Sequence, residues 1–372
     1  MSPHISVIKG DGIGIDVADA TLFLIERALG AVAAAPLNMR FIEAGAGYFA
    51  ETGKDIEPGG EVAAGKSDAI FLGAIGLPSI RHDDGTEISP HLRLRDMYGL
   101  YAGVRPVKAY PNIPGPLADA RGQDIDMVII RESTEGLFYS AAVHGRSEVS
   151  PNEVRETMLI TRDVSERLHD FAFRLAARRK EQGGKGRVTC VDKANVFTAM
   201  AFFREIFDNI ATNHPTITAD HCYVDAMALT MVRNPWDLDV LVTENMFGDI
   251  LSDLAGGLVG GMGMAACGEI GDEIGLFQPA HGSAPDIIGQ DKANPLAAIL
   301  SGAMMLDYLA ETTGAKHYDK AASLIHRAVE TGFSDNLIRP VEFGGDMGTK
   351  SVVAALDQLI TAPKIANSQG GS

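Results

Sequence analysis

The amino-acid sequence predicts an α/β protein built around a mostly parallel or mixed β-sheet. Short apolar runs alternate along the chain with longer segments of helical periodicity, which is the pattern of strands joined by helices. The 41 glycines exceed the usual share and indicate many tight turns between strands and helices. A length of 372 residues fits two domains or one large α/β unit.

The predicted elements follow from the N-terminus in alternating order. A strand at residues 4–9 ends in a glycine turn, and an amphipathic helix follows at about 16–29. Further apolar runs predict strands at 68–72, 126–131, 187–191 and 239–242, and helical periodicity predicts helices at 153–181 and 294–310. The segment 78–90, with Gly, Asp and Ser, is long enough to be a functional loop.

Charge and composition argue against several classes of function. The net charge of −17 disfavours nucleic acid and anionic membrane surfaces as partners. No apolar run reaches membrane-spanning length, and the first residues contain no signal-peptide core. The three cysteines are widely spaced, with no metal-ligand spacing, which fits a reducing compartment. We therefore expect a cytoplasmic protein without nucleic-acid or membrane partners.

The segment 243–257, TENMFGDILSDLAGG, contains two aspartates at helical spacing. Asp249 and Asp253 would lie on one face of a helix, about one turn apart. Two such carboxylates repel each other unless a cation lies between them, and Mg²⁺ and Mn²⁺ prefer oxygen ligands of this kind. The alternative is a solvated acidic face.

Cationic residues supply the other candidate groups. Arg95, Arg105 and Arg131 flank one predicted hinge, and guanidinium groups bind carboxylates with paired hydrogen bonds. With a divalent cation they would suit a di- or tricarboxylate, although each alone is compatible with a surface ion pair. Lys193 follows a predicted strand and is either a proton-transfer group or an exposed lysine at a helix start. Asp225 is a third carboxylate or a helix N-cap.

The segment 277–287, FQPAHGSAPDI, has the composition of a loop. His281, Gly282 and Ser283 could donate hydrogen bonds to phosphate or ribose. Asp286 could accept one from a ribose 2′-hydroxyl, which favours NAD over NADP because a 2′-phosphate would be repelled. Without further context the segment is interpreted as a surface loop.

Nine motifs together carry a resemblance to a known family. GDGIG, LR…VRP, RESTEG, VDKANV, VDAM, NMFGDILSD, HGSAPDI, ANP and GDMGT occur in this order between residues 5 and about 359. In this respect the chain resembles the isopropylmalate/isocitrate dehydrogenases, the β-decarboxylating dehydrogenases, which include D-malate, tartrate and homoisocitrate enzymes. It is most similar overall to the 3-isopropylmalate branch.

The resemblance implies a two-domain α/β fold around a large mixed sheet, different from a true Rossmann fold. Residues 1–103 and 260–372 would form a discontinuous NAD-binding domain. Residues 104–259 would form a central domain for dimerisation, metal and substrate, with an arm that interlocks a homodimer. The implied cofactors are NAD and Mg²⁺ or Mn²⁺.

The family's functional residues match this chain position by position. Arg95, Arg105 and Arg131 match the residues that bind the substrate carboxylates, and Lys193 matches the catalytic lysine. Asp225, Asp249 and Asp253 match the metal ligands, with Asp225 and Lys193 lent across the dimer interface. The NAD-binding loop corresponds to His281, Gly282, Ser283, Ala284, Asp286 and Asn294.

The sequence departs from the family where the last proton would be delivered. The family tyrosine is expected seven residues after Arg131, where this chain has Phe138, and Tyr139 follows. If this segment were a strand, one step would turn the side chain to the opposite face. Either a bulge re-aims Tyr139, or another group protonates the product; we take Tyr139 as the acid. Gln278 also stands where related enzymes carry glutamate.

The residues expected to select the C3 substituent are Ser89 and His91. A hydroxyl and an imidazole would be left unpaired against an isopropyl group, although His91 could also be an exposed loop residue. The expected activity is oxidative decarboxylation of a 3-substituted malate, with 3-isopropylmalate first. D-malate, tartrate or isocitrate-type substrates are the alternatives, followed by an inactive regulatory subunit.

Overall fold

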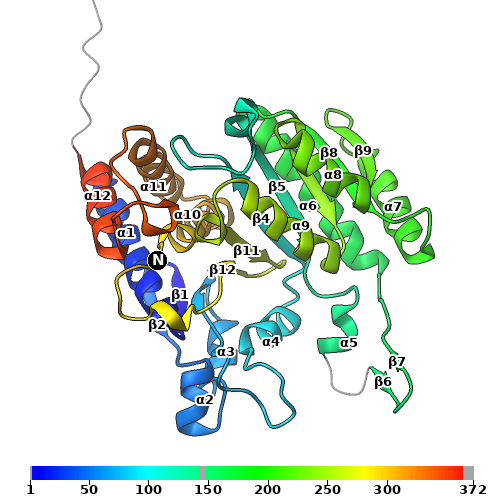
Figure 1. The fold of residues 1–372 in the computed structure, drawn as a ribbon, viewed down its shortest axis with the longest axis horizontal. Helices are drawn as coiled ribbons and strands as arrows, with labels where there is room; N and C mark the ends of the chain where they lie inside the picture. The colour runs from blue at the N-terminus through cyan, green and yellow to red at the C-terminus, as the bar shows by residue number, and fades with distance from the viewer. Residues whose placement is uncertain (1, 143–146, 363–372) are drawn as a thin grey trace, which may run out of the picture.

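One mixed ten-stranded sheet runs through the part of the chain that the computed structural model describes, residues 2–142 and 147–362 (Figure 1). Its strand order is β2-β1-β3-β12-β11-β4-β5-β10-β8-β9. Neighbouring strands are parallel except at the three consecutive pairs that join β12, β11, β4 and β5. The predicted α/β fold around a large mixed sheet is confirmed.

The strands are β1 (His4–Gly10), β2 (Asn38–Phe41), β3 (Ala69–Ala74), β4 (Ala102–Lys108), β5 (Asp126–Glu132), β8 (Arg187–Asp192), β9 (Thr218–Tyr223), β10 (Val240–Thr243), β11 (Ala266–Ile270) and β12 (Gly275–Pro279), with β6 (Glu148–Val149) and β7 (Val154–Arg155) in a separate hairpin. The helices are α1 (Ile13–Ala31), α2 (Ala46–Thr52), α3 (Gly60–Ala64), α4 (Pro90–Met97), α5 (Phe138–Ala142), α6 (Arg162–Glu181), α7 (Thr198–Ala211), α8 (Val224–Arg233), α9 (Asn245–Leu258), α10 (Leu296–Thr313), α11 (Lys316–Ser334) and α12 (Thr349–Thr361).

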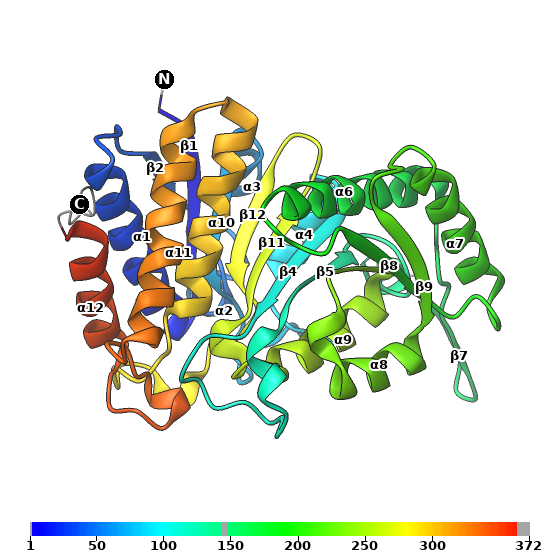
Figure 2. The same cartoon turned by 90° about the horizontal axis from the view of Figure 1, so that it is seen from above.

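Helices cover both faces of this sheet (Figures 1 and 2). On one face, α1, α10, α11 and α12 pack over one half and α6 and α7 over the other. Ile270 and Met304 contact both groups and join them. On the opposite face, α3 and α4 cover the first half, and α8 and α9 the second. Helices α4 and α9 therefore lie on the same face of the sheet.

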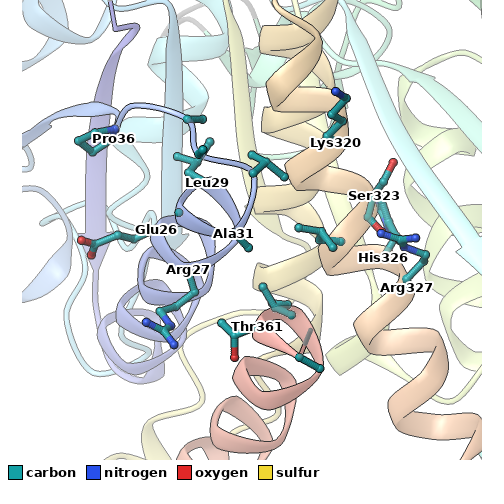
Figure 3. Close-up of a pocket in the computed structure, with 17 residues that line it drawn as sticks. Glu26, Arg27, Leu29, Ala31, Pro36, Lys320, Ser323, His326, Arg327 and Thr361 are labelled. Atoms are coloured by element: carbon teal, nitrogen blue, oxygen red, sulfur yellow. The ribbon is translucent and has the colours of Figure 1, made fainter. Parts of the chain in front are cut away.

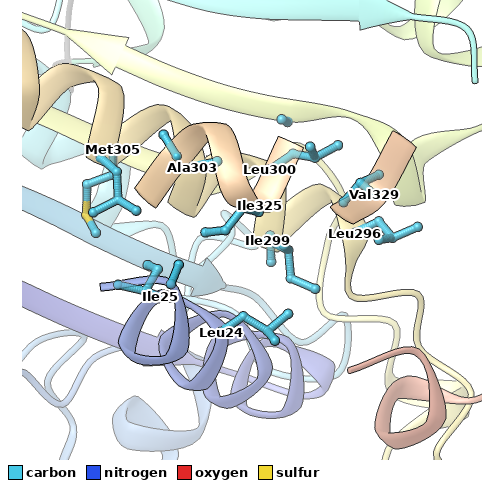
Figure 4. Close-up of a cluster of buried hydrophobic side chains, with 14 of the residues drawn as sticks. Leu24, Ile25, Leu296, Ile299, Leu300, Ala303, Met305, Ile325 and Val329 are labelled. Carbon is cyan, nitrogen blue, oxygen red and sulfur yellow. The ribbon is translucent and has the colours of Figure 1, made fainter. Parts of the chain in front are cut away.

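The largest apolar cluster joins the four helices α1, α10, α11 and α12. Leu24 and Ile25 of α1 face Leu296 and Ile299 of α10, with Ile325 of α11 beside them (Figure 4). These side chains are all less than 2% exposed, so each contributes about 2 kcal/mol of burial free energy. The half of the sheet from β2 to β11 thus has an apolar core of its own, separate from the charged residues described below.

Alternation along β5 decides where the side chain of Arg131 points. Val128 and Ile130 pack against α6 and α7, whereas Met127 and Ile129 pack against α8 and α9. Side chains two positions apart on a strand share a face. Arg131 continues the second series and therefore lies on the α9 face, at the carboxyl end of the strand.

Most predicted elements are present, with ends that differ by up to three residues. The helix predicted at 153–181 is wrong in its first nine residues, where β7 pairs with β6. Helix α6 begins at Arg162, because Thr161 caps it by accepting a hydrogen bond from the amide of Val164 at 3.4 Å. The charged residues before Thr161 have helical spacing, so the sequence predicted a longer helix than the N-cap at Thr161 permits.

The two predicted domain segments occupy different parts of the sheet. Strands from residues 1–103 and 260–372 form the half from β2 to β11, and strands from 104–259 form the half from β5 to β9. Strand β4 lies at the boundary and is paired on both sides. The division into two domains at these boundaries stays a prediction. No helix within the described ranges is long and apolar enough to cross a membrane.

Candidate active site

The end of β5 and the start of α9 bring Arg131 and Asp249 together. Asn245 accepts two hydrogen bonds from Arg131, at 2.9 Å from Nε and 2.7 Å from Nη2, and Arg131 Nη1 forms an ion pair with Asp249. A side chain at Gly248 would place its Cβ 2.7 Å from the Cβ of Arg131. Glycine at that position therefore allows the helix to approach the strand closely enough for these contacts.

Asp249 and Asp253 lie one turn apart on α9, as their spacing predicts. Burial and the neighbouring Asp249 carboxylate raise the pKa of Asp253, against the opposing effect of Arg105 and Arg131. Repulsion between two carboxylates is the condition that a bound divalent cation relieves, so the oxygen donors present here fit Mg²⁺ or Mn²⁺. No cluster of three acidic, histidine or cysteine side chains that could hold a metal occurs in the described part of the chain.

The third predicted metal ligand lies elsewhere in the same chain. Asp225 is 67% exposed in the first turn of α8, and its Oδ1 lies 2.6 Å from Nζ of Lys193. The hydrogen bond from Lys193 lowers the pKa of Asp225. The interpretation of Asp225 as an N-cap is wrong, because Tyr223 is the N-cap of α8. One protomer thus presents two separate groups, a pair of aspartates and a lysine–aspartate pair.

A buried carboxylate that the sequence analysis missed joins the other two arginines. Glu269 on β11 is fully buried, and its Oε1 lies 2.9 Å from Nη2 of Arg95 and 3.4 Å from Nη2 of Arg105. Burial alone would raise the pKa of Glu269, but the charges of Arg95, Arg105 and Arg131 outweigh it and hold the pKa at about 2. The available signal was one acid in the apolar run MAACGEIG, because a buried carboxylate requires a cationic partner.

The two residues predicted to select the C3 substituent lie at the start of α4. Ser89 is the half-buried N-cap residue of this helix. Nδ1 of His91 is buried without a hydrogen-bond partner among the described residues. Burial and the charge of Arg95 lower the pKa of His91 to about 3, so the imidazole is neutral. The alternative that His91 is an exposed loop residue is wrong, because His91 lies in α4 and is half-buried.

The backbone around Tyr139 differs from the expectation. Strand β5 ends at Glu132, and Phe138 and Tyr139 begin the short helix α5. The expectation that these residues lie in a strand, with a bulge that re-aims Tyr139, is wrong, because both lie in a helix, where one step turns a side chain by about 100°. The ring of Phe138 lies 5.2 Å from the guanidinium carbon of Arg131, and α5 contacts α4. Half-buried Tyr139 is therefore in the neighbourhood of the arginines.

The GDGIG turn and the predicted NAD loop are held against each other. The carbonyl of Ser283 accepts a hydrogen bond from the amide of Ile13 at 2.9 Å, and the Ser283 hydroxyl donates one to the carbonyl of Gly76. A Cβ at Gly12, where φ is 58°, would lie 2.2 Å from the Ser283 carbonyl oxygen. The glycine therefore permits the contact. Asp11 accepts hydrogen bonds of 2.8 Å from the amides of Ala46, Gly47 and Gly76.

The remaining residues of the predicted NAD loop surround this contact. Gly282 and Asp286 are exposed, and Ala284 adopts a left-handed backbone with φ of 38°. Burial lowers the pKa of His281, whose Nε2 has no hydrogen-bond partner in the described ranges. Asn294 donates to Glu342 at 2.8 Å and accepts from the amide of Leu296. The loop thus combines the exposed residues Gly282 and Asp286 with Ser283 and Asn294, which are fixed by hydrogen bonds.

A large hollow elsewhere carries none of these residues. It encloses about 1400 Å³ between the carboxyl end of α1, α11 and the end of α12 (Figure 3). Its side chains include Arg27, Lys320, His326 and Arg327. Size alone would therefore have indicated the wrong place, whereas the charged residues identify the candidate site.

Comparison with known proteins identifies the family to which this chain is similar. The family model for isocitrate/isopropylmalate dehydrogenases matches residues 4–356. A 3-isopropylmalate/3-methylmalate dehydrogenase of Methanocaldococcus jannaschii is 39% identical, over 93% of this chain and 95% of its own length. A 3-isopropylmalate dehydrogenase of Heyndrickxia coagulans is 37% identical, over 90% of this chain and 89% of its own.

Solved structures with the same fold include two dehydrogenases. The isocitrate dehydrogenase from Methylococcus capsulatus has a TM-score of 0.80 and 32% identity, covering 97% of this chain and 100% of the other. The β-decarboxylating dehydrogenase from Thermococcus kodakarensis has a TM-score of 0.77 and 37% identity, covering 97% and 96%.

Proposed function

This chain belongs to the isocitrate/isopropylmalate dehydrogenase family and is a decarboxylating dehydrogenase, and we propose that it oxidatively decarboxylates a 3-substituted malate with NAD and Mg²⁺ or Mn²⁺. The observation that carries this proposal is the meeting of three arginines with the aspartate pair on one face of the sheet. Arg131 forms an ion pair with Asp249, and the charges of Arg105 and Arg131 both act to lower the pKa of Asp253. An inactive regulatory subunit is disfavoured by the presence of these groups.

Each group has a role in the proposed reaction. The guanidinium groups of Arg95, Arg105 and Arg131 bind and orient the substrate carboxylates. When bound, a divalent cation would supply charge stabilisation at the substrate oxygen, and NAD would supply the hydride acceptor. Lys193, through a water and Asp225, would take the proton of the C2 hydroxyl. After CO₂ has left, Tyr139 returns a proton to the carbon that carried it.

The cation would be held by Asp249 and Asp253, with Asp225 from a second copy of the chain. The loop residues His281, Gly282, Ser283, Ala284 and Asp286, with buried Asn294, would hold NAD. In support, Lys193 and Asp225 of one protomer form a pair that is separate from its own aspartate pair. A homodimer with shared sites would unite the two groups.

Exposed apolar side chains support this dimer. Leu229 and Val232 on α8, Ile250 on α9, and Val149 and Val154 on the β6–β7 hairpin are 48–74% exposed. Two of these elements carry predicted metal ligands, so a second copy covering them would bury apolar surface and complete the site at once.

We expect Ile250→Asp to dissociate the dimer. A charge without a partner in an apolar interface costs several kcal/mol, so the dimer dissociation constant should rise by roughly 10²-fold or more. Analytical ultracentrifugation measures this shift, and activity should fall with the dimer fraction. Val62→Asp, which changes an exposed valine on α3, should leave assembly intact. A fully dimeric Ile250→Asp protein would contradict the proposed interface.

The substrate can be tested directly. NADH formation with Mn²⁺ should be compared for 3-isopropylmalate, D-malate, tartrate and isocitrate, with NAD and with NADP. The relatives named above favour 3-isopropylmalate, whereas neutral His91 beside Ser89 favours a more polar C3 group. Absence of turnover with every compound would refute the proposed function.

Tyr139→Phe is expected to lower the rate of overall turnover by about 10²-fold, the usual contribution of a positioned acid. Loss of the hydroxyl removes the proposed donor to the product carbon but leaves the carboxylate-binding groups in place. Release of CO₂ and NADH, followed together, measures the effect. Tyr48→Phe, at a half-buried tyrosine on the similarly short α2, is the matched control. Full decarboxylating activity in Tyr139→Phe would show that another group donates the proton.

A further inference from the structure

We propose that Glu269 is a specificity-determining residue: it permanently neutralises one of the three arginine charges and so restricts the site to dicarboxylate substrates. The proposal rests on the function above, since it assumes that these arginines bind substrate. It goes beyond that function because it assigns a selective role to a residue that touches the arginines rather than the C3 substituent.

The sheet register brings Glu269 to the arginines. Gly103 on β4 is paired with Glu269 on β11 at one side and with Arg131 on β5 at the other. Directly paired residues project to the same face, and so does Arg105, two positions after Gly103. Glu269, Arg105 and Arg131 therefore point toward the face on which α4 and α9 lie.

Glycine at position 103 keeps this row open. A Cβ there would lie 2.7 Å from the hydroxyl oxygen of Ser133 and 3.0 Å from Oε2 of Glu269. Without a side chain between them, the carboxylate and the guanidinium groups act on one another across the strand. Arg95 approaches the same carboxylate from α4, and its Nη2 makes the shorter contact, 2.9 Å against 3.4 Å for Arg105.

The carboxylate of Glu269 is ionised at neutral pH. It is fully buried and its pKa is held at about 2 by the arginines. Three guanidinium groups and the Glu269 carboxylate leave a net charge of two positive units, since the two charges of Asp249 and Asp253 would be balanced by the divalent cation that they hold. That charge matches the two carboxylates of a 3-substituted malate, whereas a tricarboxylate such as isocitrate carries one negative charge more.

The arginines keep hydrogen-bonding capacity for a ligand. Nε of Arg95 and Nε of Arg105 are buried without a partner among the described residues, as is Nδ1 of His91 beside them. Buried donors without partners are rare in folded proteins and commonly mark a place that a ligand completes. Glu269 therefore occupies part of the arginine site and leaves part of it available.

Calorimetry with unreactive anions tests the wild-type protein first. Succinate carries two carboxylates and tricarballylate carries three, and neither has a hydroxyl group to oxidise. With the full-length protein in Mg²⁺, succinate should bind about tenfold or more tightly than tricarballylate, because the third charge meets Glu269. Equal or tighter binding of tricarballylate would overturn the proposal without any mutation.

The second arm replaces the carboxylate with an uncharged isostere. In Glu269→Gln the affinity ratio should shift by about tenfold toward tricarballylate, and the kcat/KM ratio should shift in the same direction toward isocitrate. Glu132→Gln is the matched control, since Glu132 is also buried but accepts its hydrogen bonds from Thr134 and the amide of Glu135. Its selectivity should be unchanged.

The outcomes separate the two proposals. If dicarboxylates bind and turn over but Glu269→Gln weakens both anions equally, Glu269 only supports the arginines and the selectivity proposal fails alone. If the wild-type protein binds neither anion and oxidises no malate derivative, the proposed function fails, and this inference fails with it.

Discussion

Asp253→Asn should lower kcat by roughly 10³-fold. A bound cation contributes several kcal/mol of charge stabilisation in reactions of this type, and about 1.4 kcal/mol corresponds to a factor of ten. The substitution removes one of the two carboxylates that α9 presents on one face. Steady-state NADH formation over a Mn²⁺ titration measures both the loss in kcat and the weaker binding of the metal.

The matched control is Asp319→Asn, at an exposed aspartate in the first turn of α11. It should retain the wild-type rate and metal dependence. Wild-type kcat in Asp253→Asn at saturating Mn²⁺ would show that the aspartate pair is only a solvated acidic face.

Lys193→Met should lower kcat by about 10³-fold while the substrate affinity changes little. Proton transfer by a positioned side chain contributes about 10² to 10⁴ in rate, whereas binding rests on the arginines. Nζ of Lys193 lies 2.6 Å from Asp225, so the variant also loses the partner that lowers the pKa of this aspartate. The pH profile of kcat and calorimetric binding of the substrate separate these effects, with Lys66→Met at an exposed lysine as control.

Mixing two inactive variants tests whether sites are shared between subunits. If Lys193 serves the aspartates of a second copy, a hybrid of Lys193→Met and Asp253→Asn chains contains one intact site and one doubly altered site. Random mixing of two-fold dimers then restores about one quarter of wild-type activity. No recovery in verified hybrids would place both groups in one protomer and refute the shared site.

Local periodicity was sufficient for part of the site. Asp249 and Asp253 share a helix face because their spacing is one turn, and Arg131 lies at a strand end that an apolar run defines. These are properties of neighbouring residues, so they could be predicted without the fold. Strand β5, which carries Arg131, was predicted to within one residue for the same reason.

Contacts between residues far apart in the sequence could not be predicted from local patterns. Glu269 and Arg105 are 164 positions apart and meet only because β11 pairs antiparallel with β4. No local pattern specifies that neighbour. Tyr139 was placed wrongly for a related reason: the strand was assumed to continue past Glu132, whereas the backbone turns into α5.

The Asp11 turn has a thermodynamic consequence for the proposed cofactor loop. Its carboxylate ties together the end of β1, the start of α2 and the segment at Gly76, and Gly76 in turn accepts from Ser283. Fixing one residue's backbone costs about 1–2 kcal/mol of conformational entropy. The hydrogen bonds that fix Gly76 and Ser283 form during folding, so this part of the loop is already ordered before a dinucleotide binds. A dinucleotide would therefore bind with a smaller entropic penalty than it would to a loop that binding had to order.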